Sequence, residues 1–178
     1  MRNYILLVFL LLFFSCQKAS RQPTVIEDAP KAAGVSTKVI LVRHAEKVLD
    51  GTSNPRLTKD GIERAEKLAD LLKNENIKAI YSTPYKRTTA TVKPTSILQN
   101  KVVQMYDPSD HENFLMHAIK QYAGGTILIA GHSNTIPIIL NILTNSEKYK
   151  QLEDDEYGKI FTVHIPYDGI ATVVEDEY

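Results

Sequence analysis

Apolar and polar positions follow two patterns along the chain: short continuous apolar runs, and longer stretches with an apolar residue every three or four positions. The first pattern is typical of strands buried on both faces, and the second is typical of helices with one buried face. The two patterns alternate, which predicts strands and helices in alternation. The expected strands are 38–42, 77–81, 102–105, 126–130, 160–165 and 170–174, and the expected helices are 59–73, 84–98, 112–122 and one that opens at Asn134 or Thr135.

Several residues mark the ends of these elements. Thr58 is suited to cap the helix that follows it, in which Ile62, Ala65, Leu68, Ala69 and Leu72 share one face. Pro84 suits the first turn of the next helix, whereas Pro94 is expected to kink or shorten it. Residues 166–169, Pro-Tyr-Asp-Gly, are typical of a turn between the last two strands.

The order of elements predicts the fold class. Strands that alternate with helices form a largely parallel sheet with helices on both faces. The last two strands, joined by a tight turn, should add an antiparallel edge. We therefore expect an α/β fold, a three-layer α/β/α sandwich with a mostly parallel, mixed sheet, formed by residues 38–178 as one domain. In such sheets ligands bind beyond the carboxyl ends of the strands.

The first 15 residues have the layout of a secretory signal peptide. Arg2 precedes an unbroken apolar run from Tyr4 to Phe14, which the small residue Ser15 follows. The run is too short for a transmembrane helix, which needs about 20 residues to cross about 30 Å of hydrocarbon. Residues 1–15 are therefore expected to direct export.

The next residue refines this prediction. Phe14-Ser15-Cys16 resembles a bacterial lipoprotein signal, in which the cysteine receives lipid. Cys16 is the only cysteine in the chain, so lipidation would leave an exported protein without a free thiol. Residues 16–37 are mostly polar and are expected to tether the domain to a membrane of the bacterial cell envelope, on the periplasmic side or the cell surface. The alternative is a plain secreted protein with a free Cys16.

Composition excludes several classes of function. The formal net charge is zero and no basic block is present, which argues against a nucleic-acid partner. The five histidines are scattered without the i, i+4 spacing of a helical zinc pair, and one cysteine cannot form a thiolate metal cage. We therefore expect no metal site.

Three of the expected strand ends carry residues suited to phosphate. Arg43 and His44 follow the first strand, Arg87 lies after the second, and His132 and Ser133 follow the fourth. Arginine offers paired donors to phosphate oxygens, and a neutral imidazole can attack phosphorus when its other nitrogen is held. A helix that begins after His132 would add backbone N–H donors. Each residue alone could be an ordinary surface or turn residue, but their joint placement favours a phosphate pocket with a nucleophile.

Four segments resemble, in order, motifs of the histidine phosphatase (phosphoglycerate mutase-like) superfamily. The resemblance implies that His44 carries the phosphoryl group, that Arg43, Arg87 and His132 surround the phosphate, and that no metal or cofactor is needed. It also implies a backbone carbonyl as the acceptor for the other nitrogen of His44, and Ala45 stands where the family has glycine. The segments are 41–47 (Leu-Val-Arg-His-Ala-Glu-Lys), 57–61 (Leu-Thr-Lys-Asp-Gly), 81–91 (Tyr-Ser-Thr-Pro-Tyr-Lys-Arg-Thr-Thr-Ala-Thr) and 129–134 (Ile-Ala-Gly-His-Ser-Asn).

The proton donor to the leaving group is less clearly marked. Asp107 is the first choice because it lies at the end of the third strand, Asp110 is the second, and Glu46 is the third because it is near His44 in sequence. Each could instead be a structural residue, since Ser109 or Asp110 is also suited to cap the next helix.

These residues predict a metal-independent phosphatase that acts on a phosphorylated small molecule through a phosphohistidine on His44. The chain is short, with little sequence for a closed pocket, which favours hydrolysis over a phosphoglycerate-mutase-like phosphotransfer. Phosphorylated envelope sugars or lipids are one substrate class, and a protein phosphohistidine is another. The alternative from a different class is a phosphate-binding lipoprotein that has lost turnover.

Overall fold

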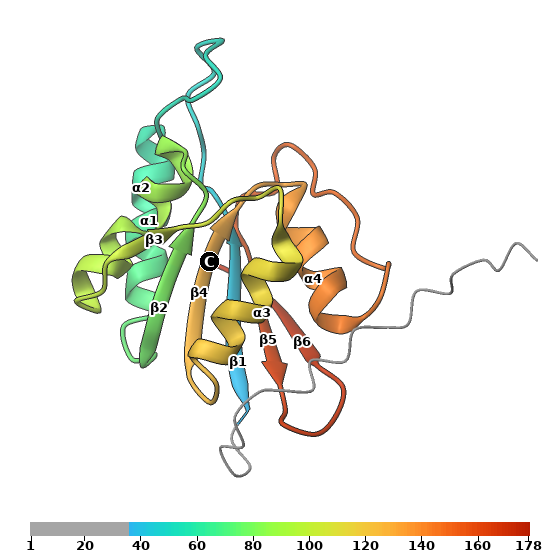
Figure 1. Ribbon diagram of the computed structural model, residues 1–178. Coiled ribbons are helices and arrows are strands. Elements are labelled where there is room, and N and C mark those ends of the chain that lie inside the picture. Colours follow the sequence, from blue (N-terminus) through green and yellow to red (C-terminus); the bar gives the residue numbers. More distant parts are fainter. Residues whose placement is uncertain (1–35) are drawn as a thin grey trace, which may run out of the picture.

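The computed structural model describes residues 36–178 (Figure 1). The predicted signal peptide, Cys16 and all but the end of the predicted tether lie outside the described residues. Within residues 36–178, no helix combines the length and apolar character needed to cross a bilayer.

A six-stranded mixed sheet forms the middle layer (Figure 1). Its strand order is β3-β2-β4-β1-β5-β6. The first four strands are parallel, β5 pairs antiparallel with β1, and β6 pairs antiparallel with β5. The parallel sheet with an antiparallel C-terminal edge is thus confirmed. The strands are β1 (Thr37–Arg43), β2 (Ile77–Ser82), β3 (Val103–Met105), β4 (Thr126–Gly131), β5 (Lys159–Ile165) and β6 (Thr172–Glu177).

Two pairs of helices cover the two faces of the sheet, which completes the three predicted layers (Figure 1). Successive side chains of a strand point to opposite faces, so Val39 and Leu41 pack with α3 and α4, whereas Ile40 and Val42 pack with α1 and α2. Apolar residues fill both faces, as a strand buried on two sides requires. The helices are α1 (Lys59–Leu71), α2 (Lys86–Leu98), α3 (His111–Gln121) and α4 (Thr135–Thr144).

Three details differ from the sequence expectations. Thr37, expected in the tether, begins β1 and is buried, and its Oγ1 accepts a hydrogen bond from Gly124 N. Ile62, expected on the buried face of α1, is 52% exposed because it lies at the edge of that face, in the first turn. Pro94 does not shorten α2, which continues to Leu98 because its neighbours Thr91, Val92 and Thr95 are buried in the domain and hold its last turns.

The start of α1 holds the loop that follows β1. Thr58 caps α1, as predicted, by accepting from Gly61 N at 3.1 Å, and Thr58 N donates to the carbonyl of Glu46 at 2.9 Å. A Cβ atom at Gly61 would overlap that same carbonyl oxygen, so only glycine lets the helix approach so closely. The residues after β1 are therefore fixed by a neighbouring helix.

Candidate active site

The pairing of β1 with β4 brings the two motif histidines together. Arg43 lies opposite Gly131 in the parallel register, and His44 N donates to the Gly131 carbonyl at 2.9 Å. His44 and His132 are therefore the first residues after the two strands, at the same end of the sheet. The rings of His44 and His132 lie with centroids 5.5 Å apart and planes at 66°.

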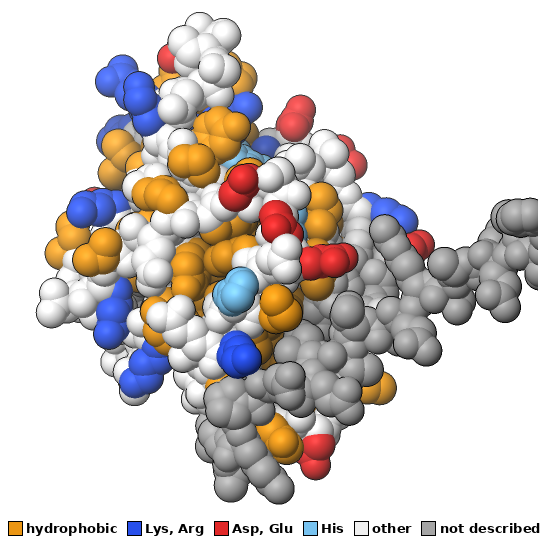
Figure 2. Space-filling view, viewed as in Figure 1, with side chains coloured by type: hydrophobic (Ala, Val, Ile, Leu, Met, Phe, Trp, Pro, Cys, Tyr) orange, Lys and Arg blue, Asp and Glu red, His pale blue; other side chains and the backbone are white. Residues whose placement is uncertain are grey.

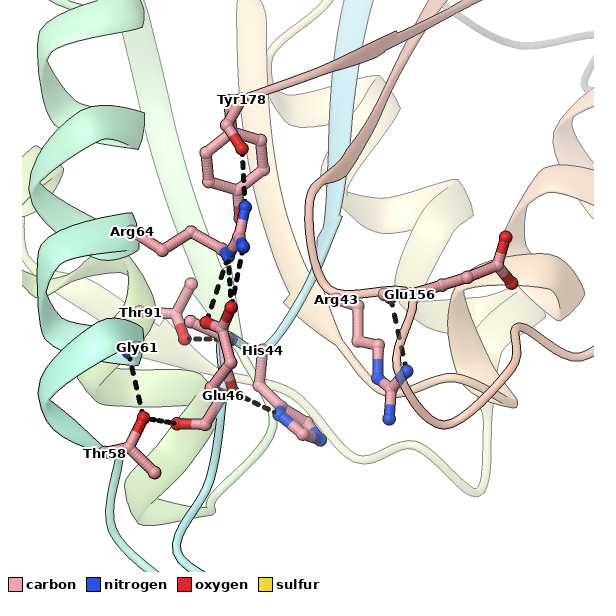
Figure 3. Close-up of polar contacts among 10 residues, drawn as sticks. Arg43, His44, Glu46, Thr58, Gly61, Arg64, Thr91, Glu156 and Tyr178 are labelled. Atoms are coloured by element: carbon pink, nitrogen blue, oxygen red, sulfur yellow. Dashed lines mark hydrogen bonds and ion pairs between the residues drawn. The ribbon is translucent and has the colours of Figure 1, made fainter.

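His44 is fixed in the form that a nucleophile needs. Its Nδ1 lies 2.8 Å from the carbonyl oxygen of Ala45 (Figure 3). Because a carbonyl only accepts, Nδ1 carries the proton and the lone pair is on Nε2. Burial, followed by the positive charges of Arg43 and Arg87, lowers the pKa of His44 to about 3. The imidazole is therefore neutral at physiological pH, and the backbone acceptor implied by the resemblance is the Ala45 carbonyl.

The residue that replaces the family glycine fits its surroundings. Ala45 is fully buried, and its methyl group packs with Leu57 and Ala65. Its N–H donates to Thr91 Oγ1 at 2.9 Å, and the Thr91 hydroxyl in turn donates to the Arg87 carbonyl at 2.7 Å. Ala45 thus anchors the loop after β1 to α1 through its side chain and to α2 through its N–H.

Arg43 is buried beneath a segment near the C-terminal end of the chain. Its Nη1 donates to the carbonyls of Glu153 and Glu156, at 2.6 and 3.2 Å, and its guanidinium lies 4.3 Å from the Tyr157 ring centroid. The same ring lies 5.9 Å from that of His44. Tyr157 is therefore a wall of the pocket that no sequence motif identified.

Arg87 and His132 form a hydrogen-bonded pair. Arg87 Nη2 donates to His132 Nδ1 at 3.3 Å, so the ring proton is on Nε2, which donates to Thr83 Oγ1 at 2.9 Å. The Thr83 hydroxyl donates to Thr88 Oγ1 at 3.0 Å, and that hydroxyl donates to backbone carbonyls. This chain of donors fixes the tautomer and orientation of His132.

The electrostatics of the pocket suit an anion with several oxygens. Burial, then the charges of Arg87, Arg43 and Lys47, lowers the pKa of His132 to about 4. The Nε atoms of Arg43 and Arg87 are buried and have no hydrogen-bond partner among the described residues. Two guanidinium groups with free donors beside two neutral imidazoles can bind a phosphate and expose it to Nε2 of His44.

Ser133 lies directly after His132, and its backbone carbonyl accepts a hydrogen bond from Leu152 N at 3.0 Å.

Among residues 36–178, no group of three or more histidine, cysteine or acidic side chains has the arrangement to hold a metal ion.

The three carboxylates considered as proton donors are all engaged elsewhere. Glu46 forms an ion pair with Arg64, with 2.6 Å between Oε1 and Nη2 (Figure 3). Asp110 caps α3 by accepting from Asn113 N. Asp107 follows β3, is exposed, and accepts from the backbone and hydroxyl of Ser109 at 2.8 and 2.7 Å. The structure thus unites Arg43, His44, Arg87 and His132 but brings none of the three carboxylates into hydrogen-bonding contact with them.

The sequence profile of the "Histidine phosphatase superfamily (branch 1)" matches residues 39–107 of the chain. This range contains Arg43, His44 and Arg87, which the structure places in the pocket. The profile match and the fold together support membership of the histidine phosphatase superfamily. They also support a phosphatase enzyme. No protein of curated function matches the sequence significantly.

Solved structures share the fold of residues 36–178. At identities under 20%, the likeness is one of fold. The protein histidine phosphatase SixA, solved with tungstate, has a TM-score of 0.67 and 17% identity, with 79% of this chain and 96% of that chain covered. A phosphoserine phosphatase mutant from Entamoeba histolytica, solved with phosphoserine, has a TM-score of 0.64 and 19% identity, with coverage of 78% and 95%. Phosphoglycerate mutase from Bacillus anthracis has a TM-score of 0.63 and 15% identity, with coverage of 80% and 93%.

The hydrogen bonds of Thr83 predict a role in positioning His132. Thr83→Val keeps the shape of this fully buried side chain but removes the acceptor for His132 Nε2. We expect kcat/KM for a phosphomonoester to fall about tenfold, on the scale of one lost buried hydrogen bond, about 1–3 kcal/mol. Thr83→Ser keeps the hydroxyl and should restore most of the activity. Equal activity of the Val and Ser variants would contradict this role.

Proposed function

We propose that the protein is a metal-independent phosphatase that hydrolyses a phosphomonoester through a phosphohistidine on His44. The observation that carries the proposal is the state of His44. It is buried and neutral, its Nδ1 is held by a backbone carbonyl, and it lies beside two guanidinium groups with free donors. Binding alone would not require a nucleophile prepared in this way.

The reaction proceeds in two displacements at phosphorus. Arg43 and Arg87 hold the phosphate oxygens and stabilise charge that builds on them. Nε2 of His44 forms a bond to phosphorus, while the bond to the leaving oxygen breaks and its electron pair stays on that oxygen, which takes up a proton. Water then attacks the phosphohistidine, the P–N bond breaks, and inorganic phosphate leaves with His44 restored to its neutral form.

Asp107 is the proposed proton donor. Glu46 is committed to Arg64 and Asp110 to the start of α3, whereas the carboxylate of Asp107 accepts its hydrogen bonds from Ser109, within its own exposed loop. Those hydrogen bonds from Ser109 lower the pKa of Asp107. To act as an acid, Asp107 must therefore leave Ser109 when substrate binds, which an exposed loop residue can do.

The proposed substrate is a phosphorylated small molecule. Structures of this fold from Entamoeba histolytica hold phosphoserine and 3-phosphoglyceric acid, both small phosphomonoesters. A phosphatase is favoured over a mutase, because a mutase must protect its phosphohistidine from water and this short chain has little sequence for a closed pocket. Ser133 is proposed to contribute to phosphate binding from its position after His132.

We also propose that the protein is exported and held to a membrane of the bacterial cell envelope by lipid on Cys16. This proposal rests on the charged start, the short apolar run and the position of the single cysteine in the sequence. Attachment through several acyl chains would hold the domain firmly at the membrane surface.

The principal test is hydrolysis of an aryl phosphate by the purified protein in the presence of EDTA. We expect activity that EDTA does not reduce, and a loss of at least about 10³-fold in His44→Ala, because the variant has no nucleophile. His117→Ala, at an exposed position of α3, is the matched control and should keep full activity. Activity that EDTA abolishes would contradict the metal-independent mechanism.

A second candidate, a phosphate-binding lipoprotein without turnover, is favoured by one observation: within residues 36–178, no carboxylate forms an ion pair with Arg43, Arg87 or either pocket histidine. The same assay separates the two functions. A folded protein that binds phosphate but hydrolyses neither aryl nor alkyl phosphates would support the binding role.

The role of Asp107 predicts a dependence on the leaving group. Asp107→Asn should lower kcat for an alkyl phosphate by about 10²-fold, the scale of general acid catalysis. It should change kcat for nitrophenyl phosphate less than about threefold, because nitrophenolate leaves without a proton. Asp168→Asn, in the exposed turn after β5, is the control. Equal losses on the two substrates would exclude Asp107 as the proton donor.

A further inference from the structure

A groove of about 510 Å³ lies beside the phosphate pocket, along the first two turns of α2. Its floor and sides are formed by Pro84, Tyr85, Lys86, Ala90, Lys93 and Met105. This volume is within the range for sites that bind small molecules, about 300–1,000 Å³. At one end, Asn54 Oδ1 accepts from Lys86 N at 2.8 Å, which fixes the loop before α1 against the start of α2.

Tyr85 is a wall shared by the groove and the phosphate pocket. Its ring centroid lies 5.0 Å from that of His132, and the guanidinium of Arg87 lies 4.6 Å from the ring. Arg87 also donates to the Ser53 carbonyl at 3.3 Å, in the loop that closes the end of the groove. A group attached to a phosphate bound at Arg87 and His132 would therefore enter the groove by passing Tyr85.

The charges of the groove suit an anion some distance from the phosphate. Lys86 and Lys93 are seven residues apart on α2, so they lie on one face about 10 Å apart along the axis. Neither forms an ion pair with an acidic side chain among the described residues. Figure 2 shows lysine and arginine side chains along the side of the domain that carries α2 and β3, and acidic side chains near the start of α3.

The surface between the two lysines is apolar. Pro84 and Ala90 line it, and Met105, at the end of β3, is 52% exposed there. An exposed methionine beside a site offers a flexible apolar contact. A ligand that runs along this surface from a phosphate at Arg87 to Lys93 needs an apolar section between its two charged ends.

We propose that the groove binds the leaving group of the substrate, and that this leaving group is elongated, with an apolar section and a second anionic group that reaches Lys93. This inference rests on the proposed function for its phosphate end. A three-carbon acid is too short, because two C–C bonds of about 1.5 Å span only about 3 Å, whereas Arg87 and Lys93 are six residues apart on α2, a rise of about 9 Å. The groove thus selects for longer phosphomonoesters than phosphoserine.

Binding of phosphonates tests the groove without requiring turnover, because their P–C bond resists hydrolysis. The probes are ω-carboxyalkyl phosphonates with short and long chains, each paired with its uncharged methyl ester, and the readout is Kd by calorimetry on the full protein. We expect the long acid to bind about fivefold more tightly than its ester, near the upper limit for an exposed ion pair, and the short acid to show no such preference. Lys93→Gln should reduce the ratio of the ester Kd to the acid Kd to about one, and Lys93→Arg should restore the wild-type ratio.

Lys101→Gln is the matched control, because Lys101 is an exposed lysine just beyond α2 and outside the groove, and it should keep the wild-type ratio. A ratio near one in the wild-type protein, a ratio that Lys93→Gln does not change, or no binding of any phosphonate would overturn the proposal. Charge-dependent binding without hydrolysis of any phosphate would support the groove proposal and refute the phosphatase function. Hydrolysis of aryl phosphate, together with equal Kd values for the long acid and its ester, would support the phosphatase function and refute the groove proposal.

Discussion

The parallel pairing of β1 with β4 is the constraint on which the rest of the site depends. The register places Arg43 opposite Gly131, so the residues after each strand, His44 and His132, emerge side by side. A slip of one residue would turn every buried side chain of a strand to the other face, so the two apolar cores hold this register strongly. Gly131 contributes through its lack of a side chain, since a Cβ there would lie 2.6 Å from the Thr135 hydroxyl that accepts from His132 N. The geometry of the reaction is thus set by core packing well below the pocket.

Neighbouring elements then hold the charged groups that the strands bring together. Two guanidinium groups beside buried imidazoles are costly to assemble, because burial and like charge both oppose it. The fold compensates with backbone carbonyls and aromatic rings: Arg43 donates to the carbonyls of Glu153 and Glu156 and packs on Tyr157, and Arg87 packs on Tyr85. These contacts leave donors unused on both arginines. A bound phosphate would neutralise the excess positive charge, which makes the pocket selective for anions.

Much of the fold and the centre of the site could be predicted from the sequence, because both depend on local patterns. The apolar runs fix the strands, and the carboxyl-end rule of parallel sheets brings Arg43, Arg87 and His132 to His44. Thr83 and Tyr85 lie within a quoted motif but have ordinary residue types, so their contacts with His132 emerge only in three dimensions. Tyr157 is more than 100 residues from His44 in sequence. It lies near His44 only because residues 152–158 pass over the carboxyl end of β1. The proton donor could not be identified from sequence, because carboxylates near a motif are equally suited to ion pairs and caps, as Glu46 and Asp110 show.

The central claim is a covalent phosphoryl group on His44, and trapping that intermediate tests it most directly. The protein would be mixed with an aryl phosphate, quenched within milliseconds in alkali, where phosphohistidine survives, and the peptide containing His44 analysed by mass spectrometry. We predict that this peptide carries the mass of one phosphoryl group on His44, and that the modification disappears once the substrate is exhausted. Steady release of phosphate with no modified histidine at any time, or phosphorylation of another residue, would contradict the mechanism.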